Sequence, residues 1–151
     1  MIPNSEAPFL ESTAQNLPRA QALETRSVLV VDDNAVFTQA LRAVLANAGF
    51  AVSTFNAGLA ALRHAGENRP DAAIIDIHLP DISGLVLTHR LRDLLGNDVP
   101  LVILSGDTSM ETINSLPHVG ATYFFSKPVQ GSHLVSKLRE WMGPPPRDEA
   151  V

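Results

Sequence analysis

The sequence predicts an α/β protein in which five parallel strands alternate with five helices in a three-layer α/β/α sandwich. Short runs of apolar, β-branched residues alternate along the chain with longer amphipathic segments, which is the pattern of a parallel sheet with helical crossovers. Residues 71–77 are mostly apolar, as expected of a strand that is buried on both faces. Right-handed crossovers would then place helices on both sides of the sheet.

The individual elements follow from apolar runs, capping residues and helix breakers. The first helix should begin after the cap residue Asn34 and end before Gly49, and Asn56 should cap the second. Pro117 should shorten the fourth helix. The expected strands are residues 28–31, 50–55, 71–77, 99–104 and 121–125. The expected helices are residues 35–48, 56 to about 66, 84 to about 95, 109–116 and 131–142.

The two ends of the chain lack this alternation. Residues 1–26 are polar and interrupted by prolines, and we expect them to form an irregular N-terminal extension or linker. Residues 143–151 carry three consecutive prolines followed by charged residues, and we expect a flexible tail. Residues 27–142 would form the folded domain, and a chain of 151 residues with 45% hydrophobic content can fill one core.

Composition excludes several classes of function. A net charge of −5 argues against a nucleic-acid surface. The absence of cysteine rules out disulfides and thiolate metal sites and fits a reducing compartment. The first residues lack the pattern of a signal peptide, and no apolar run is long enough to span a bilayer. We therefore expect a cytoplasmic protein that binds neither nucleic acid nor membrane.

Polar side chains suited to phosphate chemistry stand where four of the predicted strands end. Asp32 and Asp33 follow SVLVV, Asp76 follows DAAII, Ser105 follows PLVIL and Lys127 follows TYFFS. Because the carboxyl ends of parallel strands meet at one edge of a sheet, these residues should converge. Three carboxylates, a hydroxyl and an ammonium can together hold a hard cation and a phosphoryl group.

Each acid also has an ordinary structural explanation. Asp32 and Asp33 are adjacent carboxylates whose repulsion a divalent cation would relieve, but they could equally cap the helix that follows. Asp76 is followed by Pro80, which keeps the strand from running directly into a helix. Its carboxylate could act as a nucleophile toward phosphorus or be a solvated turn residue.

Ser105 is weaker evidence for a functional site than Lys127. Ser105 precedes Gly106, a pair that is ordinary in turns, although the hydroxyl could donate to a phosphoryl oxygen. Lys127 would neutralise the acids, and the peptide bond to Pro128 is a candidate for cis geometry that would aim the lysine into the site. The common position at strand ends favours a functional site over four unrelated turns.

The motifs LVVDDN, IIDIHLPDISG, VILSGD and the Lys-Pro of FFSKP resemble those of the receiver domain of two-component response regulators, a flavodoxin-like, chemotaxis-regulator-like domain. The resemblance covers about residues 27–142 and implies the strand order 2-1-3-4-5. It implies that Asp76 is the phosphoacceptor and that Mg²⁺, or Mn²⁺ in its place, is bound by Asp33, Asp76 and the main-chain carbonyl of His78. Asp32 would bind the ion directly or through water.

The resemblance also implies a mechanism of switching. Ser105 would contact the phosphoryl group and move when it arrives, while Lys127 would pair with the phosphate. Phe124 stands at the position of the family's aromatic switch, without the hydroxyl of a tyrosine. His78 and Asp107 stand at positions that in the family influence how long the phosphate lasts.

The partners follow from the same resemblance. A sensor histidine kinase or a histidine phosphotransfer protein would donate the phosphoryl group from a phosphohistidine, and its helices would dock near Val36 and Phe37. The downstream partner is unknown, and a homodimer is left open. The protein would catalyse only its own phosphorylation and dephosphorylation, and would be a single-domain regulator or the receiver piece of a hybrid histidine kinase.

Two other functions stay open at this point. A Mg²⁺-dependent phosphatase of the haloacid dehalogenase type also forms an aspartyl phosphate, but it needs a DxD arrangement after the first strand that Asp32-Asp33-Asn34 does not supply. An interaction module of the same fold would work without phosphorylation.

Overall fold

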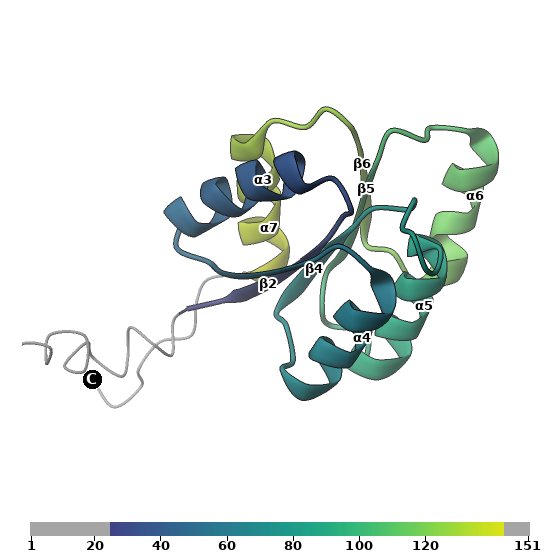
Figure 1. Ribbon diagram of the computed structural model, residues 1–151, viewed down its shortest axis with the longest axis horizontal. Helices are drawn as coiled ribbons and strands as arrows, with labels where there is room; N and C mark the ends of the chain where they lie inside the picture. Colours follow the sequence, from purple (N-terminus) through teal and green to yellow (C-terminus); the bar gives the residue numbers. More distant parts are fainter. Residues whose placement is uncertain (1–24, 144–151) are drawn as a thin grey trace, which may run out of the picture. The chain divides into compact units, whose positions relative to one another are not determined.

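The computed structural model describes residues 25–143, which form a parallel sheet of five strands with helices on both faces (Figure 1). The strands are β2 (Ser27–Val31), β3 (Ala51–Phe55), β4 (Ala72–Ile75), β5 (Leu101–Ser105) and β6 (Tyr123–Ser126). They lie in the order β3-β2-β4-β5-β6. Counted along the chain with β2 as the first strand, this is the predicted order 2-1-3-4-5, which is thereby confirmed. The predictions for residues 1–24 and 144–151 lie outside the described residues.

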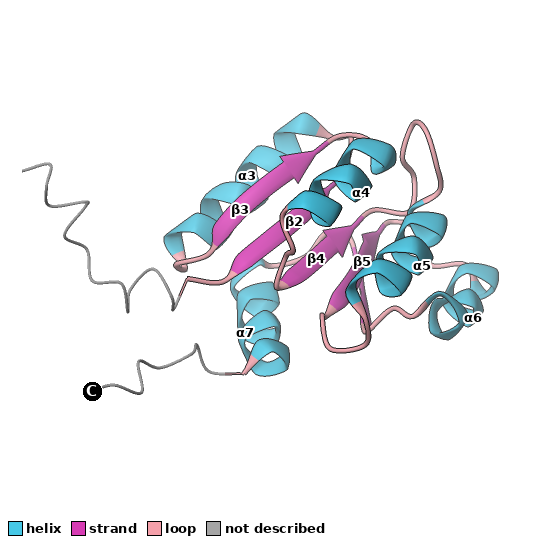
Figure 2. Cartoon of the chain, turned by 90° about the horizontal axis from the view of Figure 1, so that it is seen from below, coloured by secondary structure: helices cyan, strands magenta, loops and turns pink. Residues whose placement is uncertain are grey.

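The helices divide between the two faces of the sheet. Helices α3 (Ala35–Asn47) and α7 (Gly131–Met142) cover one face. Helices α4 (Gly58–Glu67), α5 (Gly84–Leu95) and α6 (Met110–Val119) lie on the other (Figures 1 and 2). Within residues 25–143 no helix is long and apolar enough to cross a membrane.

Alternate side chains of the central strands build a separate core on each face. Leu29, Val31 and Ile75 pack with α4 and α5, whereas Val30 and Ile74 pack with α3 and α7. All four residues of β4 are buried, as the apolar run predicted. The sheet is therefore supported from both sides, which gives the ends of its strands a rigid base.

The first of these helices is capped by an adjacent residue, and the second by a residue from a distant loop. Asn34 caps α3 as predicted, since its side chain accepts a hydrogen bond from the N–H of Phe37 at 3.0 Å. The predicted cap at Asn56 is wrong, because α4 begins at Gly58 and its cap residue makes no side-chain hydrogen bond. The carboxylate of Asp81, in the loop after β4, instead accepts from the N–H groups of Gly58 and Leu59, at 2.8 Å each.

The prediction that Pro117 shortens its helix is also wrong. Helix α6 includes Pro117 and continues to Val119. The proline lacks the N–H of one helical hydrogen bond, but the end of the helix is closed by Gly120, whose left-handed backbone (φ 84°) lets its N–H reach the carbonyls of Leu116 and Pro117. Arg92 of α5 also donates to the carbonyl of Gly120, at 2.7 and 3.0 Å. The other predicted boundaries shift by a few residues at most.

Asp81→Ala should destabilise the domain at neutral pH, because it removes the acceptor for two N–H groups at the start of α4. The hydrogen bonds from Leu59 and Gly58 hold the pKa of Asp81 below its usual 3.8. A carboxyl whose pKa is lowered by folding contributes stability above its unfolded pKa and loses it as the pH falls through the folded pKa.

The difference in unfolding free energy between wild type and Asp81→Ala should therefore be largest at neutral pH and shrink below about pH 3.8, as measured by urea titrations. Asp93→Ala serves as the control, since the Asp93 side chain is 74% exposed on α5. If Asp81→Ala lost the same amount of stability at neutral pH and below about pH 3.8, the capping role would be contradicted.

Candidate functional site

Backbone hydrogen bonds fix the predicted site residues at one edge of the sheet. The N–H of Asp32, one residue after β2, donates to the carbonyl of Phe55 at 3.0 Å. The N–H of Asp76, directly after β4, donates to the carbonyl of Val31 at 2.9 Å. The N–H of Lys127 donates to the carbonyl of Ser105 at 2.9 Å. The ladder thus extends one residue past β2, β4 and β6, and holds these side chains in place.

Three carboxylates converge at this edge. One oxygen each of Asp32, Asp33 and Asp76 lies within 4.8 Å of the others. Asp32 and Asp76 are buried, with exposed fractions of 3% and 8%, and Asp33 is exposed. Like charges at this separation repel, and burial strengthens the repulsion. The cluster therefore needs positive charge.

Lys127 supplies one positive charge. Its Nζ lies 2.6 Å from Oδ2 of Asp32 and 3.4 Å from Oδ2 of Asp76. It also lies 4.5 Å from the centre of the Phe37 ring, and the peptide bond from Lys127 to Pro128 is cis. Burial lowers the pKa of Lys127, but the hydrogen bond and charge of Asp32, followed by the charge of Asp76, raise that pKa further and leave it above its usual 10.5. The ammonium remains charged under physiological conditions.

Ser105 and His78 contact the acids or their neighbours through hydrogen bonds. The Ser105 side chain is fully buried, and its Oγ accepts from the N–H of Asp107 at 3.2 Å. The N–H of His78 donates to Oδ1 of Asp76 at 3.4 Å. The imidazole Nε2 of His78 lies 3.6 Å from Oδ2 of Asp107. The loops after β4 and β5 therefore meet beside the acidic cluster, while the predicted metal-ligand role of the His78 carbonyl stays a prediction.

Sequence reasoning missed the local role of Asp107. Its Oδ1 accepts from the N–H of Ser109 at 3.0 Å, and its Oδ2 accepts from the hydroxyl of Thr112 at 3.0 Å. These hydrogen bonds, that from the Ser109 N–H first, lower the pKa of Asp107 from its usual 3.8. The spacing Asp107-x-Ser109 ahead of a helix is the sequence signal that could have indicated this turn.

An apolar groove lies on the α7 side of the cluster. It has a volume of about 450 Å³ and is lined by Phe37, Ala40, Leu41 and Val44 of α3 and by Lys127, Pro128, Val129 and Gly131. Val36, in the first turn of α3, is 80% exposed. Phe37 is half-buried, with its ring against Lys127. Phe37 therefore lies beside Lys127 and Val36 is exposed to solvent, while the predicted contact of both residues with a partner stays a prediction.

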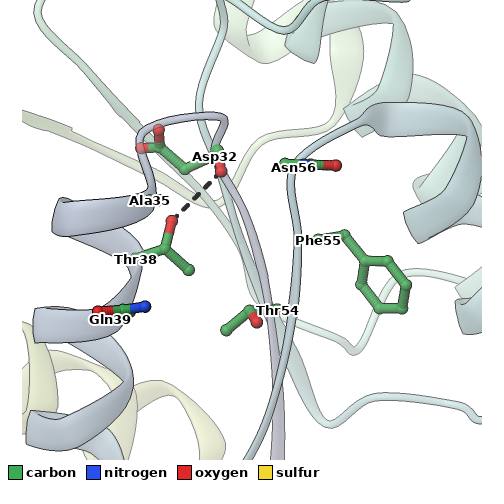
Figure 3. Close-up of a pocket in the computed structure, with 7 residues that line it drawn as sticks. All are labelled: Asp32, Ala35, Thr38, Gln39, Thr54, Phe55 and Asn56. Atoms are coloured by element: carbon green, nitrogen blue, oxygen red, sulfur yellow. Dashed lines mark hydrogen bonds between the residues drawn. The ribbon is translucent and has the colours of Figure 1, made fainter.

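A pocket of about 320 Å³ lies between α3 and β3 (Figure 3). It is lined by Asp32, Ala35, Thr38, Gln39, Thr54, Phe55 and Asn56. The hydroxyl of Thr38 donates to the main-chain oxygen of Asp32, at 3.2 Å, or to that of Asn34, at 2.8 Å. Thr38 therefore ties α3 to the turn that carries the acid pair.

Phe124 faces the core shared with α4 and α5. It is half-buried in β6 and packs against the cluster that contains Ile103 and Leu91. Phe124 therefore lies on the face of the sheet that α4, α5 and α6 cover. Its role as a switch stays a prediction.

Gly84 is required because α5 begins directly against the phosphoacceptor candidate. Its N–H donates to the carbonyl of Ile77 at 2.7 Å, and a Cβ placed on Gly84 would lie 2.0 Å from the backbone oxygen of Asp76. A side chain there could be accommodated only by moving α5 or the chain around Asp76.

Gly84→Ala should therefore lower the free energy of unfolding by roughly 1–3 kcal/mol, the usual cost of an extra methyl group in a packed region. Gly66→Ala in α4 is the matched control: a Cβ there meets nothing within 4 Å, so this variant should be as stable as wild type or up to about 1 kcal/mol more stable. Denaturant titrations measure the free energy of unfolding of both variants. A Gly84→Ala variant as stable as Gly66→Ala would contradict the close approach of α5 to Asp76.

Comparison with known proteins gives a consistent picture. Residues 28–139 match the family described as the response regulator receiver domain. The transcriptional regulatory protein PrrA of Mycobacterium tuberculosis is 38% identical over 112 residues, which are 74% of this chain and 48% of PrrA. CseB of Streptomyces coelicolor, also a transcriptional regulatory protein, is 35% identical over 113 residues, 74% of this chain and 47% of CseB. The chain thus spans about half the length of these curated relatives.

Solved structures agree in fold. The chemotaxis protein CheY4 of Vibrio cholerae is 30% identical with a TM-score of 0.72, over 77% of this chain and 98% of that one. The receiver domain of the sensor histidine kinase PA1611 from Pseudomonas aeruginosa, with a magnesium ion coordinated in its active-site cleft, is 28% identical with a TM-score of 0.73, over 79% of this chain and 98% of that one. By sequence match, strand order and acidic cluster, the chain belongs to the response regulator receiver domains, which are phosphoacceptor signalling modules rather than enzymes with separate substrates.

Proposed function

We propose that Asp76 takes a phosphoryl group from a phosphohistidine of a histidine kinase or histidine phosphotransfer protein in a Mg²⁺-dependent reaction. One observation carries the proposal: Asp76 shares a cluster with Asp32 and Asp33, within 4.8 Å, and lies 3.4 Å from the ammonium of Lys127. At this sheet edge Asp76 would serve as the nucleophile, the other two carboxylates as cation ligands and Lys127 as the counter-charge for phosphate.

The residues of the cluster fit a magnesium ion. Three carboxylates beside one ammonium leave an excess of negative charge, and carboxylate oxygens are the hard ligands that Mg²⁺ prefers. Asp33 and Asp76 would hold the ion, with Asp32 directly or through water and the His78 carbonyl as a further ligand. Mn²⁺ would suit the same oxygens. A bound ion would neutralise charge on the transferring phosphoryl group. The magnesium ion in the PA1611 receiver supports this assignment.

The chain's own residues supply a nucleophile and positions. A carboxylate oxygen of Asp76 would form a bond to phosphorus while the phosphorus–nitrogen bond of the phosphohistidine breaks, and the leaving imidazole would keep the electron pair. Lys127 is close enough to pair with a phosphoryl oxygen, and the Ser105 hydroxyl would donate to another. Positioning and charge neutralisation are most of what phosphoryl transfer requires.

Recognition and output would use surfaces next to the site. Helices of the phosphodonor protein would dock on Val36, Phe37 and the apolar groove beside them. Phe124 would respond to the movement of Ser105 and change the surface offered to a downstream protein. We assign this module to residues 27–142, acting in the cytoplasm. PrrA and CseB are transcriptional regulatory proteins, which favours an output in gene expression.

Asp76→Asn should abolish phosphorylation. Wild-type protein incubated with Mg²⁺ and acetyl phosphate, or with a phosphorylated kinase, should gain a label that is absent in the variant, because an amide is not a nucleophile toward phosphorus. Intact-mass spectrometry measures the label.

Asp93→Asn is the matched control, since it removes an exposed carboxylate on α5 and should keep the full label. Equal labelling of Asp76→Asn and wild type would contradict the assignment. Absence of label in wild type with every donor would favour the second candidate, an interaction module that works without phosphorylation.

A further inference from the structure

The ammonium of Lys127 is contacted by two carboxylates and by an aromatic ring. Its Nζ lies 2.6 Å from Oδ2 of Asp32 and 3.4 Å from Oδ2 of Asp76, and it lies over the Phe37 ring, 4.5 Å from the ring centre. The backbone of Lys127 is fixed, because its N–H donates to the carbonyl of Ser105 at 2.9 Å. Four flexible side-chain torsions separate that backbone from the ammonium. The contacts of the ammonium therefore decide where its charge lies.

The Phe37 ring is attached to the same turn as Asp32. Phe37 lies in the first turn of α3, and its N–H donates to the side chain of Asn34 at 3.0 Å. The hydroxyl of the next residue, Thr38, donates to the main-chain oxygen of Asp32 at 3.2 Å or to that of Asn34 at 2.8 Å. This turn therefore holds an aromatic ring and a carboxylate in defined positions around one ammonium.

The ring and the acids act differently on Lys127. The negative face of an aromatic ring attracts a cation, most strongly where water is excluded, and the Lys127 side chain is only 24% exposed. The ion pair with Asp32 is the stronger contact and would keep the lysine in the site without the ring. The contribution of the ring is therefore to narrow the set of side-chain conformations in which the ammonium reaches the acids.

The second lysine of the chain offers an internal comparison. Lys127 and Lys137 are the only lysines in the sequence. The Nζ of Lys137 lies 3.4 Å from Oε1 of Glu140, whose side chain is 64% exposed, and 5.9 Å from the centre of the Tyr123 ring. Exposed ion pairs of this kind contribute little. We therefore expect Lys137 to be more mobile than Lys127.

We propose that Phe37 is a positioning residue for Lys127: the face of its ring keeps the ammonium beside Asp32 and Asp76, where it can pair with an oxygen of the phosphoryl group that Asp76 receives. This inference rests on the proposed function. It gives Phe37 a role within the chain, in addition to the proposed contact with a partner. A lysine that is already in place loses little conformational freedom when the phosphoryl group arrives.

The mobility of the two lysines tests this contact in the absence of phosphate. In protein labelled with ¹³C-lysine, NMR relaxation of the Cε methylene groups should give a higher order parameter for Lys127 than for Lys137. Phe37→Leu keeps an apolar side chain but removes the ring, and should lower the order parameter of Lys127 toward that of Lys137. Phe37→Tyr keeps the ring and should retain the wild-type value.

Tyr123→Leu is the matched control, because it removes the ring beside the other lysine. It should leave the order parameter of Lys127 unchanged.

Labelling by acetyl phosphate and Mg²⁺, followed by intact-mass spectrometry, tests the consequence for the reaction. The labelling rate of Phe37→Leu should fall roughly fivefold, which corresponds to the loss of about 1 kcal/mol of cation–π attraction. Phe37→Tyr and Tyr123→Leu should be labelled at the wild-type rate. Rescue by tyrosine but not by leucine separates the effect of the ring face from that of apolar packing.

The outcomes distinguish this inference from the proposed function. The same order parameter of Lys127 in Phe37→Leu as in wild type would overturn the inference, as would equal labelling rates of Phe37→Leu and Phe37→Tyr. Neither result would affect the proposed function, since wild type would still take the label. A wild type that takes no label from any donor would overturn the proposed function, and with it the role of Phe37 in the transfer.

Discussion

Repulsion among three carboxylates at one sheet edge is the constraint on which the rest of the site depends. Asp32 and Asp76 are almost fully buried, and the ammonium of Lys127 contacts both, at 2.6 and 3.4 Å, but supplies only one positive charge. Removing charges from water costs free energy that one counter-charge does not restore for three acids. The cluster is therefore suited to bind a cation, and a bound cation would neutralise negative charge where we propose that the phosphoryl group attaches. The acids whose burial lowers the stability of the fold are the same groups that the proposed phosphoryl transfer uses.

The surrounding fold makes this arrangement sustainable. Both faces of the sheet are covered, and backbone hydrogen bonds hold Asp32, Asp76 and Lys127 one step beyond their strands. Gly84 lets α5 begin against Asp76. The strands beneath the acids are buried, whereas in α6 only Thr112 is buried, Leu116 packs against the core, and Asp107 and Arg92 form hydrogen bonds at the two ends.

The sequence was sufficient for the features that depend on periodicity. Alternating apolar runs predicted the layers, and the strand ends predicted that Asp32, Asp76 and Lys127 would meet. It failed where a partner comes from a distant part of the chain. Asp81, rather than the adjacent Asn56, caps α4, and Arg92 and Gly120 close α6 past Pro117. The bonds of Asp107 were missed because a turn signal does not reveal which hydroxyl of the next helix will be buried against it.

Thermal unfolding at rising Mg²⁺ concentration tests the charge imbalance most directly. Because the folded site should bind the ion and the unfolded chain should not, wild type should gain stability continuously, by about 2.7 kcal/mol at one hundred times the dissociation constant. Asp33→Asn, which removes the exposed carboxylate of the cluster, should lose most of this gain. A wild-type melting temperature that does not change with Mg²⁺, or an equal rise in Asp33→Asn, would contradict the account.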